Sequence, residues 1–471
     1  MPAVGAPRPI SGPGAAAFLV FALSALLLWP GVATFDTLVQ YGQMRSGGYD
    51  DWHPPAMARL WSLLHPLGGG QGPMFLLQLG LYWLGLGLVA ARLPARTGWA
   101  VLALGAFPLF LAWQAVVLKD AQMIAALLAA VGLAGWWQLR EARVPALAVL
   151  GVLLLLAYAA LVRANGVFAA VPLGLALFDL GGKRPILLRL ALGVAAIGAV
   201  IAVSGPINHD LLRAKPSGVE RTLPLYDLAG IVHRAGPAAA PVLPAAEWRA
   251  MEDRRCYGPF LWDPLGDDTR CGFLAEDLDE AAPHARLVAL WARAVATHPA
   301  AYAAHRLAHW NSTMRWIVPS GWPVAAPPGR SDPNPLGLGS PGPAMDALAS
   351  AAGWLAEGPE GAPALWFVAA LGALFAARGR STPRQRLAFA LALSAVALEL
   401  GFLVVSIASD LRYHLWAMFA TMLAWLLLAE RPLPRGAIRL TLAALLLLGA
   451  PALAARLALP PGGAGYPGMP G

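Results

Sequence analysis

Long apolar runs separated by short polar connections form the dominant pattern along this chain. A helix of about 20 residues, at 1.5 Å rise per residue, spans the hydrocarbon core of a bilayer. Runs of about that length recur from one end of the chain to the other, so we predict an all-α polytopic membrane protein. The eleven predicted spans cover residues 14–34, 72–91, 98–117, 121–138, 145–162, 165–180, 189–205, 362–377, 387–407, 412–429 and 438–457.

Basic residues gather in alternate connections between these runs. Lys and Arg accumulate in the short cytoplasmic loops of membrane proteins, which fixes the orientation. The predicted inner connections contain Arg92, Arg96, Arg140, Arg143, Lys183, Arg184, Arg189, Arg378, Arg380, Arg384, Arg386, Arg431, Arg435 and Arg439. The short outer connections hold only Lys119, Arg163 and Arg412. This asymmetry predicts a cytoplasmic N-terminus and an outer C-terminus.

The topology divides the chain into four parts. They are an N-terminal membrane module (1–205) with a first outer loop (35–71), a long outer loop (206–361), C-terminal membrane helices (362–457) and a Gly- and Pro-rich tail (458–471). The tail composition predicts disorder.

The long outer loop carries signals of its own. Residues 284–318 place Leu287, Leu290 and Trp291 at helical spacing beside arginines, which predicts an amphipathic helix on the membrane surface. The following Pro- and Gly-rich stretch predicts an irregular or mobile lid or linker. Cys256 and Cys271 lie in this loop and are predicted to form a disulfide in an oxidising compartment.

Composition supports the membrane prediction and argues against a nucleic-acid partner. The chain is 58% hydrophobic and only 13% charged, about half the charged fraction of an ordinary soluble domain. The formal charge of +8 is dispersed in short clusters between apolar runs instead of forming one basic surface. We therefore expect the lipid bilayer as the surroundings and no nucleic acid.

Polar residues gather at the predicted outer ends of the spans. These residues are Lys119, Asp120, Arg163, Asn165, Asp410, Arg412, Tyr413 and His414. Each pair has a simpler reading, as a helix-end ion pair, a turn salt bridge or an arginine reaching lipid headgroups. Their shared level in the bundle favours a site that binds an anion and moves a proton.

The first outer loop lies at the same level. Asp36 and Gln40 share one face if residues 35–44 are helical. Gly47 and Gly48 would end that helix, and the loop continues through Asp50, Asp51, Trp52 and His53 to two prolines. The alternatives are Asp36 as a helix cap and Trp52 as an interfacial aromatic residue.

One acidic residue lies deeper in the predicted membrane. Glu399 precedes Asp410 by one long helical stretch, which places it near the bilayer middle. An ionisable group there faces a cavity or a partner. Gln78, Gln114 and Gln122 are the candidate partners, and a protonated structural Glu bonded to another helix is the alternative reading.

These features resemble the GT-C superfamily of membrane glycosyltransferases, which take a sugar from a polyprenyl-phosphate carrier. The matching features are Asp36 after the first span, "GGYDDWHPP", "LKD", "LVRANG", "THPAAYAAHRLAHW" and "SDLRYHLW". The nearest likeness is to the bacterial branch related to protein O-mannosyltransferases and aminoarabinose transferases. The resemblance implies a bacterial inner-membrane enzyme with a periplasmic active site, a polyprenyl-phosphate-linked sugar donor and an envelope acceptor.

The resemblance also implies roles for the residues. Asp36 would be the catalytic base, and Lys119, Arg163 and Arg412 would contact the donor phosphate. The remaining predicted substrate-binding residues are Gln40, Asp50, Asp51, Trp52, His53, Asp120, Asn165, Asp410, Tyr413 and His414. We expect no cofactor; a divalent cation held by His53 with Asp50 or Asp51 is the alternative.

Two other functions compete with this interpretation. A transporter or flippase of a lipid-linked or anionic substrate would explain Glu399, because an intramembrane acid can couple proton movement to transport. It explains the two large outer loops poorly. A non-catalytic scaffold would use the long loop to bind an envelope protein but leaves the charged outer residues without a purpose.

Overall fold

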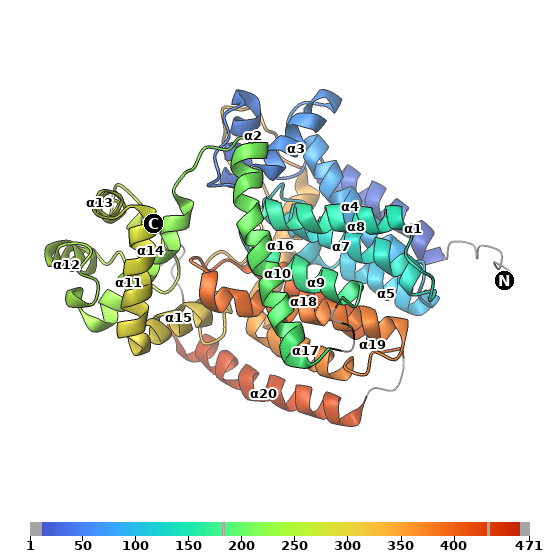
Figure 1. Cartoon of the computed structure of the whole chain (residues 1–471). Coiled ribbons are helices and arrows are strands. Elements are labelled where there is room, and N and C mark those ends of the chain that lie inside the picture. The colour runs from blue at the N-terminus through green and yellow to red at the C-terminus, as the bar shows by residue number, and fades with distance from the viewer. Residues whose placement is uncertain (1–11, 181, 183, 431–433, 462–471) are drawn as a thin grey trace.

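A computed structural model describes residues 12–180, 182, 184–430 and 434–461 (Figure 1). The helices aligned with the predicted spans are α1 (Gly12–Leu28), α4 (Gly72–Ala90), α5 (Ala95–Gly105), α6 (Pro108–Gln114), α7 (Lys119–Gln138), α8 (Ala146–Val162), α9 (Val167–Leu177), α10 (Ile186–Pro206), α17 (Pro363–Ala376), α18 (Pro383–Val405), α19 (Leu415–Leu428) and α20 (Arg435–Ala458). The helices of the two predicted outer loops are α2 (Phe35–Ser46), α3 (Ala56–Leu64), α11 (Thr222–Ala235), α12 (Ala245–Asp253), α13 (Phe273–Ala281), α14 (His284–Thr297), α15 (Pro299–Thr313) and α16 (Pro343–Glu357). Short helical turns are η1 (His65–Leu67), η2 (Ala164–Gly166), η3 (Ile207–Leu211), η4 (Val219–Arg221), η5 (Pro237–Ala239), η6 (Asp263–Leu265), η7 (Pro359–Gly361) and η8 (Leu411–His414). Within the described ranges there is no strand, only isolated β-bridges.

The apolar runs are helices, which is consistent with a helical membrane protein. Six described helices are long and apolar enough to cross a membrane, or seven if the bent pair α5 and α6 counts as one span. The helices α1, α8, α9 and α17 are apolar but shorter. The count of eleven spans therefore stays a prediction.

The run at 98–117 is not one straight helix, which corrects the prediction. Its two helices, α5 and α6, meet at an angle of 57°. Proline at Pro108 lacks a backbone N–H and disfavours helical geometry in the residue before it. Accordingly Phe107 is extended, with ψ of 127°, and the chain turns there.

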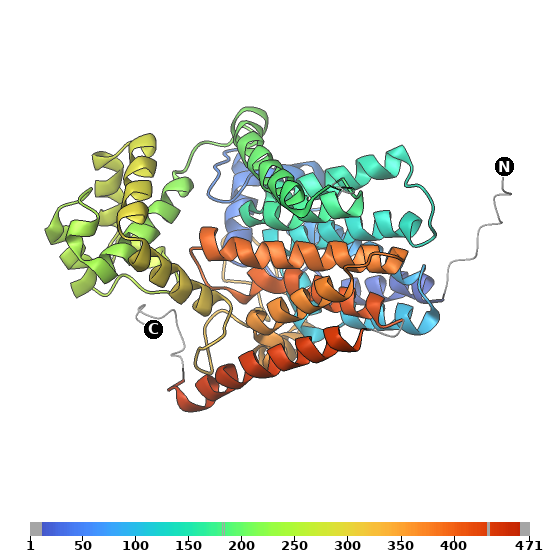
Figure 2. The ribbon, with the colours of Figure 1, turned by 60° about the horizontal axis from the view of Figure 1, so that its bottom comes forward.

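The seventh predicted span, α10, differs from the others in direction. In two views α10 is directed across α18 and α9, whereas α7, α8 and α18 run alongside one another (Figures 1 and 2). None of its residues is buried inside the protein, although its segment is the most apolar of the candidate spans. Its side chains therefore face the surroundings, as they would in lipid.

Small residues bring the central helices close together. At Gly85 of α4, an added Cβ would lie 2.3 Å from the carbonyl oxygen of Leu128 in α7. At Gly132 of α7, a Cβ would lie 2.5 Å from the carbonyl oxygen of Gly85. Only glycine permits this backbone approach, which is the usual way that helices associate in a membrane.

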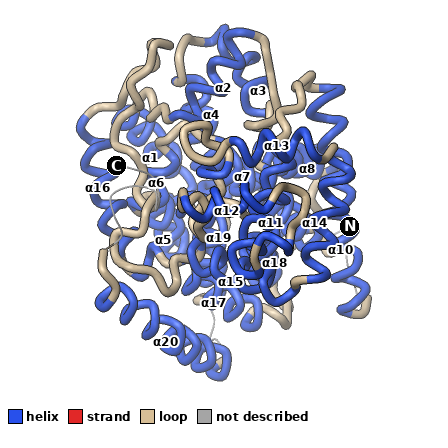
Figure 3. The backbone as a smooth tube through the Cα atoms, turned by 90° about the vertical axis from the view of Figure 1, so that its left-hand side faces the viewer, coloured by secondary structure: helices blue, strands red, loops and turns tan. Residues whose placement is uncertain are grey.

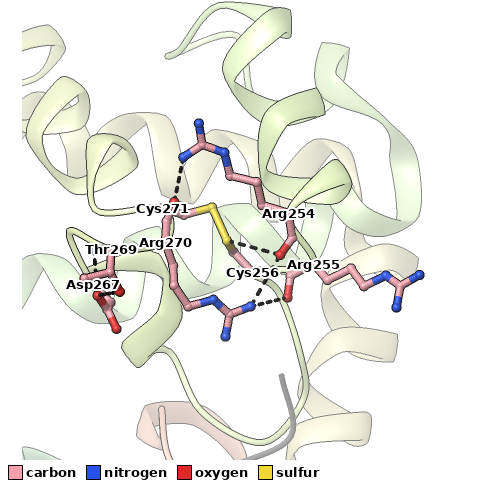
Figure 4. Close-up of a disulfide and its surroundings, with 7 residues drawn as sticks. All are labelled: Arg254, Arg255, Cys256, Asp267, Thr269, Arg270 and Cys271. Carbon is pink, nitrogen blue, oxygen red and sulfur yellow. Dashed lines mark hydrogen bonds between the residues drawn. A yellow bond between two sulfur atoms is a disulfide. The ribbon is translucent and has the colours of Figure 1, made fainter. Parts of the chain in front are cut away.

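Most of the long outer loop folds into a helical unit, which we call the loop domain (residues 222–313). It projects from one end of the bundle, and α2 and α3 lie beside it at that end (Figures 1 and 3). Its own hydrophobic cluster includes Tyr226, Trp248 and Leu274. A disulfide joins Cys256 to Cys271, as predicted (Figure 4).

The single amphipathic helix predicted at 284–318 is wrong. The segment forms two helices, α14 and α15, with Pro299 beginning the second. Leu287 is buried, and Leu290 and Trp291 pack against the hydrophobic cluster of the loop domain. The apolar face that suggested membrane contact is therefore used within the loop domain itself.

The Pro- and Gly-rich stretch after α15 has no helix until α16, as expected, but it is bonded to the bundle. Ala33 N–H donates to Ser331 Oγ at 2.8 Å, and Asp332 N–H donates to the carbonyl of Ala33 at 2.8 Å. Gln71 donates to the carbonyl of Gly339 at 2.6 Å. The predicted tail lies outside the described residues beyond residue 461, and α20 extends to Ala458.

The basic connections predicted to be inner lie together in the structure. Arg380 pairs with Asp179 at 3.4 Å, and Arg384 pairs with Glu430 at 3.2 Å. The Arg92 guanidinium stacks on the Trp136 ring. The predicted sidedness is thus internally consistent, while its assignment to the cytoplasm stays a prediction.

Candidate functional site

A short backbone pairing places the beginning of α2 beside the beginning of α7. Val32 N–H donates to the carbonyl of Ala115 at 2.8 Å, and Val117 N–H donates to the carbonyl of Val32 at 2.9 Å. Thr37 Oγ1 donates to the carbonyl of Val117 at 2.7 Å and fixes the first turn of α2. Asp36 and Lys119 are consequently neighbours, although Thr37 and Val117, which bond the two elements, are 80 residues apart in the chain.

Asp36 shares two cations. Its Oδ2 lies 3.7 Å from Lys119 Nζ and 3.4 Å from Arg412 Nη1. Burial alone would raise the pKa of Asp36, but Lys119 and Arg412 outweigh it and hold that pKa well below its usual range. The carboxylate is therefore ionised throughout the neutral range.

Arg412 and Arg163 connect further carboxylates to this centre. Arg412 Nε lies 2.7 Å from Asp410 Oδ2 and 3.8 Å from Asp120 Oδ2. Arg163 Nε lies 3.1 Å from Asp120 Oδ1, and its guanidinium stands 4.2 Å from the centre of the Tyr413 ring. We call Asp36, Lys119, Asp120, Arg163, Asp410 and Arg412 the charged cluster.

The charged cluster contains three cations and three carboxylates, and its three cations differ in how closely they are paired with carboxylates. Arg163 forms an ion pair with Asp120 and a cation–π contact with the Tyr413 ring. Arg412 is closest to Asp410. Among the carboxylates of the described residues, Lys119 pairs with Asp36 alone, at 3.7 Å, so its charge is the most loosely paired of the three cations.

Some side chains of the charged cluster are partly exposed, and others are buried. The side chains of Asp36 and Arg412 are 16% and 17% exposed, whereas Asp120 is 2% exposed. Burial raises the pKa of Asp410 to about 6, although Arg412 acts in the opposite direction. Asp36 and Arg412 are the most exposed members; together with Lys119, which is 9% exposed and pairs with Asp36, we call them the accessible layer, and Asp120 and Asp410 are more deeply buried.

His53 lies within this layer and is bonded to Lys119. Lys119 Nζ donates to His53 Nδ1 at 2.6 Å. Burial and the positive charge of Lys119 lower the pKa of His53 to about 4. The imidazole is therefore neutral at pH 7, with Nδ1 as the acceptor and the hydrogen on Nε2.

Asp50 and Asp51 are not brought to His53. Asp51 accepts a hydrogen bond from Ser217 N–H at 2.7 Å and lies 3.4 Å from His209. Asp50 accepts from the backbone of Trp52 at 3.1 Å. No group of three His, Cys, Asp or Glu side chains among the described residues could hold a metal ion, so the alternative of a cation held by His53 with Asp50 or Asp51 has no supporting geometry.

Three other predicted residues lie on or next to elements that carry the cluster, and a fourth, Trp52, contacts the loop domain. Gln40 is buried on α2, one turn after Asp36. Asn165 lies in η2, two residues after Arg163, and Tyr413 follows Arg412 directly in η8. The Trp52 ring contacts the Trp262 ring of the loop domain, with centroids 5.6 Å apart.

Glu399 has a different partner from those predicted. Its Oε2 is 2.7 Å from Nδ1 of His414, and both side chains are fully buried. Gln78, Gln114 and Gln122 lie elsewhere: Gln122 donates to Gln78, which donates to the carbonyl of Gln114. None of the three candidate glutamines bonds to Glu399; a bond to another helix, as in the alternative reading, fits, because His414 belongs to the helical turn η8.

Loop-domain residues near the cluster were missed at the sequence level. Trp262 N–H donates to the carbonyl of Ile407 at 2.9 Å, and Ser409 N–H donates to the carbonyl of Phe260 at 2.8 Å. Asp263 follows directly, and its pKa is raised by burial and, in part, by the charge of Asp36. The segment "THPAAYAAHRLAHW", one of the matching features quoted above, is a different part of the loop domain, and most of it lies in α15.

Comparison with known proteins gives no relative for this chain, since no family model, curated protein or solved structure matches it.

Proposed function

We propose that this protein is an integral membrane glycosyltransferase of the bacterial inner membrane, with its site on the outer face. It would move a sugar from a polyprenyl-phosphate-linked donor to an envelope acceptor. The observation that carries the proposal is the accessible layer of the charged cluster, where one carboxylate shares two cations beneath the loop domain. A GT-C-like fold with eleven spans is the architecture that this proposal assumes.

The chemistry asks for three things at one place. The acceptor oxygen attacks the anomeric carbon, the bond between that carbon and the phosphate oxygen breaks, and the electron pair leaves with the polyprenyl phosphate. The acceptor proton passes to Asp36 as general base. Lys119 and Arg412 would neutralise the charge that develops on the leaving phosphate.

Binding of the donor would also change the basicity of Asp36, because Asp36 is held in two ion pairs. A carboxylate held by two cations is a weak base, because its pKa lies well below its usual range. A phosphate that binds Lys119 and Arg412 brings negative charge next to Asp36 and draws those cations away. Both changes raise the pKa of Asp36 and make it a better base when the donor is present.

The remaining predicted residues would have supporting roles. Arg163 is already paired with Asp120, so it would hold Tyr413 and the back of the cluster more than the phosphate. Trp52 and Trp262 would border the sugar or acceptor, because aromatic rings present flat apolar faces. The isoprenoid tail would stay in the bilayer while the phosphate reaches the cluster.

A transfer assay tests the proposal. The purified protein in lipid nanodiscs would be offered polyprenyl-phosphate-linked sugars and a membrane glycolipid extract, with product detected by mass spectrometry. We expect transfer by the wild type and a loss of at least about a hundredfold in Asp36→Asn. The matched control is Asp346→Asn, which removes an exposed carboxylate paired with Arg330 and should leave transfer unchanged.

The result also separates the competing functions. Transfer that persists in Asp36→Asn would remove this residue as base. Absence of transfer by a folded wild type with every carrier tried would favour the transporter or flippase. The buried Glu399–His414 pair is the observation on which that second candidate rests, because a titratable pair can carry a proton.

A further inference from the structure

The polar face of α15 lies against the segment that carries Asp410 and Arg412. Arg306 Nη1 donates to the carbonyl of Ser406 at 2.6 Å, and His309 Nε2 lies 2.9 Å from Ser406 Oγ. Two further bonds follow one turn later. Ser312 Oγ lies 2.7 Å from Ser409 Oγ, and Thr313 Oγ1 lies 2.8 Å from His414 Nε2.

The same helix is anchored in the loop domain on its other side. Asp227 is fully buried and pairs with Arg306. Its two oxygens also meet His305 Nε2 at 3.0 Å and the Trp291 indole N–H at 2.8 Å. A buried carboxylate needs this many partners, so the position of α15 is well determined.

His309 is bonded on both sides, and its bonds fix its tautomer. Nδ1 donates to the carbonyl of Pro259 at 2.8 Å, which leaves Nε2 as the acceptor for the Ser406 hydroxyl; the carbonyl of Ala408, 3.1 Å from the same Oγ, is the competing acceptor. Burial lowers the pKa of His309 to about 3, and the ring is therefore neutral. The bond to Ser406 is thus a neutral hydrogen bond, which a glutamine side chain could replace.

The only regular element within the segment 406–414 is the short helical turn η8. One isolated antiparallel β-bridge, between Leu261 and Ala408, joins the segment to residues 260–262. In addition, Leu411 N–H donates to the carbonyl of Val324 at 3.1 Å. Side-chain support comes from α15 at both ends of the segment, at Ser406 and at His414. Arg412 lies between those two supports.

We propose that α15 is a positioning element for the phosphate site, holding Ser406, Ser409 and His414 so that Arg412 meets Asp36. Arg306 and His309 are the positioning residues at one end, and Ser312 and Thr313 at the other. The proposal rests on the proposed function for its ligand, a lipid-linked phosphate. It adds that the loop domain sets the affinity of the site without touching the phosphate.

A double-mutant cycle tests the proposal with farnesyl phosphate as the probe, in nanodiscs, by the change in tryptophan fluorescence. We expect His309→Ala to weaken binding about tenfold, and His309→Gln to restore most of it through its bond to Ser406. In an Arg412→Gln background, His309→Ala should weaken binding by less than about twofold. The control is His284→Ala, which removes an exposed imidazole of the loop domain.

Equal losses from His309→Ala in both backgrounds would overturn the proposal, because independent effects add. Ser312→Ala serves as a milder variant if His309→Ala does not fold, and an oxidised Cys256–Cys271 bond reports on the loop domain in each variant.

The same cycle, measured as the free energy of unfolding, needs no ligand. Coupling between His309 and Arg412 in that measurement supports the positioning role even if the wild type fails to bind farnesyl phosphate. That failure would then count against the proposed function alone, and additive unfolding energies would count against α15.

Discussion

Replacing Arg412 by Gln should destabilise the protein more than the loss of an ordinary surface charge. The Arg412 guanidinium lies 2.7 Å from Asp410, 3.4 Å from Asp36 and 3.8 Å from Asp120. Its side chain is only 17% exposed, so solvent screens these pairs weakly. The variant leaves three partly or fully buried carboxylates without the cation that they share.

The magnitude follows from these distances. At an effective dielectric constant of about 20, two unit charges 3.4 Å apart attract by about 5 kcal/mol. The variant no longer buries the guanidinium, which returns part of this energy. Removing one partner of a buried pair then costs about 3–5 kcal/mol in the free energy of unfolding at pH 7.

The cost should decrease as the pH is lowered toward 5. The pKa of Asp410 is about 6 with Arg412 present, and loss of the cation raises it further. Because the pKa in the folded state lies above the ordinary value of 3.8, protonation below that pKa favours the folded state. Asp410→Asn should likewise recover part of the loss when combined with Arg412→Gln.

Unfolding by SDS in lipid–detergent micelles, followed by tryptophan fluorescence, measures these free energies. Arg330→Gln is the control, because its pair with Asp346 is 77% and 39% exposed, and we expect near-wild-type stability. A loss below about 1 kcal/mol for Arg412→Gln, unchanged between pH 7 and pH 5, would refute the reasoning. The cluster would then be as weakly coupled as surface ion pairs.

Two further changes test the supports of the cluster by the same unfolding measurement. The wild type should lose free energy of unfolding relative to His53→Gln as the pH falls from 6.5 to 4, by up to about 3 kcal/mol. The reason is that the unfolded state of the wild type binds a proton in this range, whereas folded His53, with its pKa of about 4, does not. A difference between the two proteins that does not change with pH would contradict this. Gln78→Leu should lower the free energy of unfolding by about 1–3 kcal/mol, because the carbonyls of Gln114 and Val116 lose a donor at 2.7 and 2.9 Å. The control is Gln138→Leu, which removes a half-buried amide. A loss of stability in Gln78→Leu that is no larger than in the control would show that these bonds contribute little.

Features that depend on local pattern could be predicted from the sequence. Each apolar run is helical because its composition leaves no other way to satisfy the backbone in lipid. The grouping of Lys119, Arg163 and Arg412 followed from charge asymmetry, and the structure brings Asp36 to Lys119 and Arg412 and joins Arg163 to the same cluster through Asp120. The disulfide followed from two cysteines in one loop.

Features that depend on contacts between distant segments could not be predicted. Asp51 bonds to Ser217, 166 residues away, so its separation from His53 had no local signal. His309 meets Ser406 across 97 residues, and in the sequence it is one of several polar residues in a segment predicted to be an amphipathic helix. The three candidate glutamine partners of Glu399 lie on other predicted spans, whereas His414 lies only 15 residues further along the chain.

The composition of the charged cluster has a consequence for how the protein is made. Asp36, Lys119 and Asp120 leave the ribosome early, whereas Arg412 follows Asp120 by about 290 residues. At a synthesis rate of roughly 5–20 residues per second, Asp36 and Asp120 wait roughly 15–60 s for Arg412, the second cation of each. During that interval, within the charged cluster, Asp36 has only Lys119 and Asp120 has only Arg163 as a cationic partner, because both of these cations lie in the half of the chain that is made first. Completion of the cluster is therefore a late step in biogenesis, and it occurs only once α18 and α19 have joined the bundle.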